Sequence, residues 1–123
     1  ITAIGSLHSA HIKFRHQAKA GDILCVAGSL GYAHVGLTSL EEKKSGFEDY
    51  QKAFLKPNAK VEEGIWLGQF PCVHAMMDLS DGLYIDLKRL CKASRLGATI
   101  ELTQFTLSPS FKTDCKKLKL NPY

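Results

Sequence analysis

Two aspartates lie three residues apart in the stretch MMDLSDGL, which spans residues 76–83. Asp78 closes an apolar run, Asp81 precedes a helical pattern, and Ser80 lies between them. Two carboxylates at the carboxyl end of a strand suit a hard divalent cation such as magnesium, which takes oxygen ligands and shares its shell with substrate phosphates. Ser80 could then donate a hydrogen bond to a phosphate oxygen. The pattern therefore predicts Asp78 and Asp81 as metal ligands.

A simpler interpretation of the same residues stays open. Ser80 or Asp81 could cap the helix that follows, since a carboxylate there is favourably placed near the positive end of the helix dipole. A cap explains one acidic residue only, and Asp78 would then need a basic partner to offset the cost of its charge. The sequence holds no arrangement of Ser, His and Asp, or of Cys and His, that indicates a covalent nucleophile.

Apolar residues recur at helical spacing and predict helices at residues 32–44, 47–55, 59–70 and 81–95. Short apolar, partly β-branched runs predict strands at residues 1–4, 23–28, 72–79 and 96–105. Taken in chain order, these elements predict a mixed α/β (α+β) domain in which the helices pack on a mixed sheet.

Two stretches of the sequence are rich in charged residues. In the helix predicted at residues 81–95, Asp86 and Arg89 lie off the apolar stripe, which consists of Leu83, Leu87, Leu90 and Cys91. The stretch FKTDCKKLKL at residues 111–120 holds four lysines of a chain whose net charge is +4. No aromatic residues are interleaved there for stacking on bases, so a solvated helix face or tail is expected and nucleic-acid binding is not.

The cysteines bear on the cellular compartment. Cys25, Cys72, Cys91 and Cys115 are widely spaced and form no C-x-x-C pair, which is typical of reduced thiols in a cytosolic protein. No apolar stretch approaches the roughly 20 residues that a membrane-crossing helix needs. A cytoplasmic protein without membrane contact is therefore expected.

The order and spacing of several motifs resemble those of bacterial thiamine-monophosphate kinase. The motifs are ITAIG, Arg15 followed by AKAGD, ILCVAGSLG, LKPNAK, AMMDLSDGL and KASRLGATIEL. The resemblance covers essentially the whole chain. Its most specific part is the combination of D-[LI]-S-D-G-L after an apolar run with the upstream Arg15 segment. Tyr32 and Lys60 depart from the family, which commonly has aspartate and arginine at these places.

The resemblance implies magnesium-dependent transfer of the γ-phosphate of ATP to thiamine monophosphate, giving thiamine diphosphate. Carried over by position, it implies that Asp78 and Asp81 bind magnesium and that Ser80 and Arg15 contact ATP. Direct in-line transfer is expected, in which the protein positions the reactants and neutralises charge without a phospho-enzyme. The full-length protein is expected to be a homodimer built through N-terminal strands.

The resemblance also implies a fragment. Residues 1–21 would be the last strand of an N-terminal domain with a connector, and residues 22–123 a truncated C-terminal α/β domain. Further metal-binding aspartates and a substrate motif of the family do not occur in this sequence, so the chain alone is expected to be inactive. Two alternatives stay open. One is another ATP-dependent member of the superfamily, similar to aminoimidazole-ribotide synthetase or selenophosphate synthetase, and the other is a non-catalytic assembly module.

Overall fold

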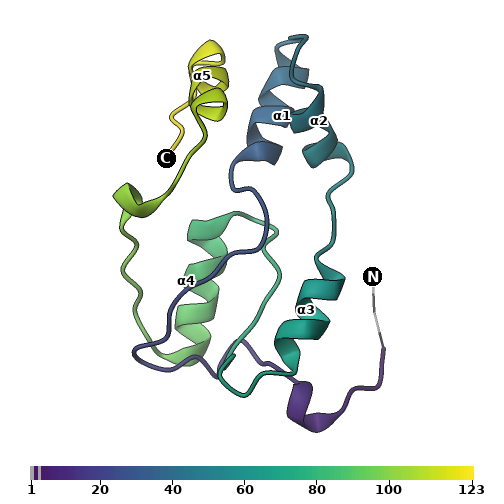
Figure 1. The fold of residues 1–123 in the computed structure, drawn as a ribbon, viewed down its shortest axis with the longest axis vertical. Coiled ribbons are helices and arrows are strands. Elements are labelled where there is room, and N and C mark those ends of the chain that lie inside the picture. The colour runs from purple at the N-terminus through teal and green to yellow at the C-terminus, as the bar shows by residue number, and fades with distance from the viewer. Residues whose placement is uncertain (1, 3) are drawn as a thin grey trace. The chain divides into compact units, whose positions relative to one another are not determined.

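The computed structural model describes residues 2 and 4–123 (Figure 1). The chain divides into two compact units, of which unit 1 comprises residues 1–27 and 60–98 and unit 2 comprises residues 28–59 and 99–123. Unit 1 holds the short 3-10 helix η1 (Ser9–His11), α3 (Val61–Gly68) and α4 (Leu83–Ser94). Unit 2 holds α1 (Tyr32–Glu41), α2 (Glu48–Leu55), η2 (Leu102–Gln104) and α5 (Pro109–Lys117). The expected domain boundary between residues 21 and 22 stays a prediction.

The four helices expected from sequence are confirmed as α1 to α4. Their first turns explain part of this agreement. Glu48 and Asp49 begin α2, and Glu62 and Glu63 begin α3, so that negative side chains lie at the positive end of each helix dipole. Among the described residues, no helix has both the length and the apolar character needed to cross a lipid bilayer.

Sequence reasoning left the end of the chain as a solvated face or tail, and the structure forms α5 there. The helix begins as local chemistry dictates, because the Ser108 hydroxyl accepts a hydrogen bond from the Phe111 N–H at 3.2 Å and Pro109 occupies the first turn. Lys116 and Lys117 lie in the last turn, near the negative end of the dipole. Lys116, Lys117 and Lys119 are exposed and Lys112 is partly buried, whereas Phe111 on the same helix is buried.

The expected mixed sheet is wrong. Residues 2 and 4–123 contain no strand (Figure 1). The runs 23–28 and 72–79 are extended or turn-like segments without a ladder partner, and the run 96–105 includes the 3-10 helix η2. Residues 1 and 3 of the strand expected at 1–4 lie outside the described part of the chain. An apolar run expresses a tendency to be buried, whereas a strand also needs a neighbouring backbone to pair its N–H and C=O groups. Because the run 23–28 has no such partner, its apolar residues are not covered by a sheet, and Ile23 is 88% exposed.

The hydrophobic core belongs to unit 2, where α1, α2 and α5 contribute to one cluster. It consists of Val35, Phe47, Tyr50, Phe111, Cys115 and Leu118. The Tyr50 hydroxyl donates to the Asp114 carboxylate at 2.9 Å and so ties α2 to α5. Burial, helped by that carboxylate, raises the pKa of Tyr50 to about 12, so the hydroxyl stays a donor at neutral pH.

Helices α1 and α2 pack against each other (Figure 1), and their closest approach is at Gly36. A Cβ atom placed there would overlap the Tyr50 carbonyl and would come within 2.9 Å of the Gln51 amide nitrogen. Those neighbours are backbone atoms, which cannot move aside as a flexible side chain would. The helix pair therefore requires a residue without a side chain at position 36.

We expect Gly36→Ala to destabilise unit 2 by about 1–3 kcal/mol, the usual cost of overpacking. Gly64→Ala is a matched control, because Gly64 also lies within a helix but a Cβ there meets open space. That control should stabilise the protein by about 0.5–1 kcal/mol through helix propensity. Chemical denaturation of both variants measures the difference, and equal effects at the two glycines would contradict the close approach.

Candidate metal and phosphate site

The loop that carries Asp78, Ser80 and Asp81 lies in unit 1 and leads into α4. Gly82 precedes the first helical residue with φ 98° and ψ 157°, a conformation essentially confined to glycine. The N-cap residue is thus Gly82, which has no side chain to cap the helix, so the interpretation of Ser80 or Asp81 as a simple helix cap is wrong. Asp78, Ser80 and Asp81 are all exposed.

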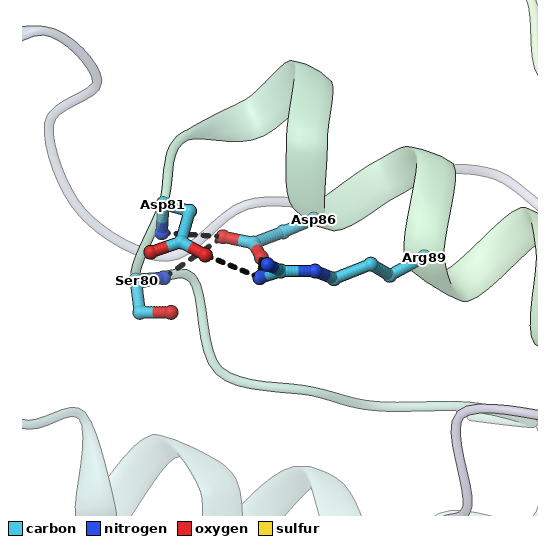
Figure 2. Close-up of polar contacts among 4 residues, drawn as sticks. All are labelled: Ser80, Asp81, Asp86 and Arg89. Atoms are coloured by element: carbon cyan, nitrogen blue, oxygen red, sulfur yellow. Dashed lines mark hydrogen bonds and ion pairs between the residues drawn. The ribbon is translucent and has the colours of Figure 1, made fainter.

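Asp86, four residues into α4, holds the loop in place. One oxygen of its carboxylate, Oδ2, accepts hydrogen bonds from the backbone N–H of Ser80 at 2.9 Å and of Asp81 at 2.8 Å (Figure 2). Only 2% of Asp86 is exposed, although Asp86 lies off the apolar stripe of the helix. The apolar stripe of α4 did not predict this contact, because Asp86 is covered by the loop before the helix and hydrogen-bonded to it, and is not packed among apolar side chains.

The hydrogen bonds to Asp86 lower the pKa of its carboxyl group. The Asp81 N–H is the main cause that lowers the pKa of the Asp86 carboxyl, with further lowering by the Ser80 N–H and by Arg89, while burial opposes them. A carboxyl with a lowered folded pKa stabilises the fold fully above the pKa of an unfolded aspartate, about 3.9. That stabilisation is lost as the pH falls through the lower folded value.

Arg89 supplies the positive charge of the site. Its Nη1 donates to Asp81 Oδ2 at 2.5 Å and to Asp86 Oδ1 at 2.9 Å, so one guanidinium nitrogen joins the loop to the helix (Figure 2). These two carboxylates, Asp81 first, raise the pKa of Arg89. The alternative interpretation required a basic partner for Asp78, but the ion pair of this loop is made by Asp81, and its partner Arg89 was missed. The spacing of Asp86 and Arg89, three residues apart on a helix, was the available signal.

The loop offers oxygen donors of the kind that magnesium binds. Asp78 takes part in none of the ion pairs among residues 2 and 4–123, and Asp81 uses only Oδ2 toward Arg89. No group of three acidic, His or Cys side chains forms a metal cage within the described residues. Magnesium commonly uses one or two protein carboxylates and fills its shell with water and phosphate. The carboxylate oxygens of the two aspartates are thus of the donor type that such an ion takes.

Arg15 lies elsewhere in unit 1. Its backbone carbonyl accepts a hydrogen bond from Ser94 Oγ at 2.8 Å, and Ser94 is the last residue of α4. The Ser80 loop lies at the first turn of that helix, and a helix of 12 residues is about 18 Å long. The structure thus brings Ser80 and Asp81 together with Asp86 and Arg89, and it does not bring the backbone of Arg15 to them.

A basic depression of about 440 Å³ adjoins the Arg15 segment. Lys13, His16, Lys19 and His74 contribute to its lining. His74 Nδ1 pairs with Asp22 Oδ1 at 2.8 Å, which offsets one of these positive groups when the imidazole is protonated. The surplus of cationic side chains favours an anionic occupant over a cation.

The sequence of the chain matches a described family. The model of the C-terminal domain of AIR synthase related proteins matches residues 19–121. The chain belongs to this family. The loop with Asp78, Ser80 and Asp81 and all of α4 lie inside the matched range of the AIR synthase related C-terminal domain, whereas Arg15 precedes it.

Curated relatives carry the name thiamine-monophosphate kinase. That of Methanospirillum hungatei is 36% identical over 88% of this chain and 35% of its own length, and that of Haemophilus influenzae is 35% identical over 89% of this chain and 34% of its own length. A third, from Buchnera aphidicola, is 33% identical over 93% of the chain and 38% of its own length. The chain thus spans about a third of the length of these relatives. No solved structure matches it.

We expect Asp86→Ala to release the Ser80 loop. The backbone N–H groups of Ser80 and Asp81 lose a charged acceptor, so their hydrogen exchange with solvent should become about tenfold faster or more. Asp49→Ala removes an exposed carboxylate from α2 in unit 2 and serves as the control. Amide exchange followed by NMR tests this, and unchanged exchange at both residues in Asp86→Ala would contradict the arrangement.

Proposed function

We propose that this chain is the C-terminal part of a thiamine-monophosphate kinase, which transfers the γ-phosphate of ATP to thiamine monophosphate and forms thiamine diphosphate. The observation that carries the proposal is the similarity to three proteins of that name at 33–36% identity over 88–93% of the chain. The exposed oxygen donors of the loop before α4 support the chemistry, because phosphoryl transfer depends on cations placed beside phosphate.

In this proposal Asp78 and Asp81 hold magnesium, which when bound neutralises charge on the transferred phosphate and its neighbours. The exposed position of both carboxylates leaves them open to a polyphosphate approaching from solvent. The Ser80 hydroxyl, carried by the same loop, donates to a phosphate oxygen. Asp86 fixes the backbone of the loop at Ser80 and Asp81 by its two contacts.

Arg15 contacts a different part of ATP in this account, because its backbone lies at the far end of α4 from Ser80. The neighbouring basic depression, to which Lys13 and Lys19 contribute, supports an anionic group on that side of unit 1. No side chain is proposed as a covalent nucleophile, so the phosphate passes directly between the two substrates.

We further propose that the chain alone is inactive. Its described residues offer no complete metal cage, and the chain covers about a third of the length of its relatives. In this proposal the rest of the parent enzyme supplies further metal ligands. The homodimer that the resemblance implies and the cytoplasmic location that the cysteine pattern indicates are retained as parts of the proposal. The family match to AIR synthase related proteins keeps a second candidate, another ATP-dependent reaction of this superfamily.

Phosphoryl transfer from ATP to thiamine monophosphate, measured with magnesium on the full-length parent enzyme, tests the proposal. The parent should form thiamine diphosphate, and the double variant Asp78→Asn, Asp81→Asn should be at least about 100-fold slower while remaining folded. The control variant Asp49→Asn removes an exposed carboxylate of α2 in unit 2 and should keep the parental rate.

Two results would contradict parts of this account. A parent that binds ATP but makes no thiamine diphosphate belongs to another activity of the superfamily. A double variant as active as the parent would show that the two aspartates have no role with metal or phosphate, and that Asp81 serves only its ion pair with Arg89.

A further inference from the structure

The ion pair with Arg89 occupies one carboxylate oxygen, Oδ2, of Asp81, a residue that the proposed function takes as a metal ligand. Asp81 Oδ2 accepts from Arg89 Nη1 at 2.5 Å, and Figure 2 shows the guanidinium extended along α4 to the loop. A divalent cation bound to the same oxygen would lie against the guanidinium, and two positive charges at that separation repel each other. Metal and Arg89 therefore compete for Asp81.

The two bonds of Arg89 differ in how easily they open. The side chains of Asp81 and Arg89 are 46% and 48% exposed, and exposed ion pairs of this kind are held weakly. The Asp86 side chain is 3% exposed and has two backbone N–H partners besides Arg89. Exchange of partners at Asp81 therefore leaves the loop anchored through Asp86.

We propose that Arg89 is an internal counter-cation for Asp81, which a divalent metal must displace before it binds there. The inference rests on the proposed function, since it takes Asp81 as a metal ligand. Arg89 is a positioning residue in this account. It holds the loop carboxylate in a defined place without metal, and it lowers the metal affinity by the work of separating the pair. Asp86 keeps the displaced guanidinium close to the site.

Binding of Mn²⁺ to the full-length parent protein, measured by its electron paramagnetic resonance signal at fixed ionic strength, tests this without substrate. Arg89→Gln should tighten binding about three- to tenfold, because it removes the competing charge. Lys88→Gln is the matched control, since it removes the same formal charge from the neighbouring exposed position on α4 and should change the dissociation constant little. Arg89→Lys keeps a positive charge and should stay close to wild type.

A second measurement needs no variant and so does not depend on the folding of Arg89→Gln. During a Mg²⁺ titration of the wild-type chain, the NMR signals of the Arg89 guanidinium should shift together with the Asp81 amide and saturate at the same concentration. Displacement from Asp81 is the physical reason for the joint shift.

Several outcomes would overturn the proposal. These are equal or weaker Mn²⁺ binding in Arg89→Gln, equal tightening in Lys88→Gln, or an Asp81 signal that responds to Mg²⁺ while Arg89 does not. Absence of any effect of either metal on Asp81 would overturn it as well. None of these outcomes tests which substrate the parent enzyme uses. If the parent enzyme does not make thiamine diphosphate, only the kinase assay will show it.

Discussion

The carboxylate of Asp86 is the constraint on which the candidate site depends. It is almost fully buried, and it accepts the backbone N–H groups of Ser80 and Asp81 where the loop enters α4. A buried charge is costly unless donors replace its hydration, and here two amides and a guanidinium do so. The loop is thereby fixed from inside the unit, while the side chains that face solvent remain open to ligands.

Helices could be predicted from the sequence because the features that form them are local. Strands could not be predicted in this way, since the backbones with which they must pair are not local. The spacing of apolar residues and the acidic first turns of α2 and α3 predicted α1 to α4. The start of α5 was equally readable in Ser108 and Pro109, but the lysines drew the interpretation toward a solvated tail. The apolar runs that were expected to be strands indicate only a tendency toward burial. Even this tendency fails at Ile23, which is 88% exposed.

The site shows the same limit at the level of single residues. Sequence pattern identified Asp78, Ser80 and Asp81 by residue type and position, and the structure places them on one loop. The sequence pattern could not show that Asp86 holds this loop. Helical periodicity predicts on which face of the helix a residue lies, but it does not predict the path of the loop before the helix. Nor could it separate Arg15 from Ser80, since their distance depends on Ser94 holding the Arg15 backbone at the far end of α4.

The most direct test of this account is a pH titration of the Asp86 side-chain carboxyl by carbon-13 NMR, with the amide signals of Ser80 and Asp81 followed in parallel. The account predicts that Asp86 titrates with a pKa below the ordinary aspartate value and that both amide signals move with that same pKa. A carboxyl that titrates at or above the ordinary value, with the two amides unaffected, would contradict it.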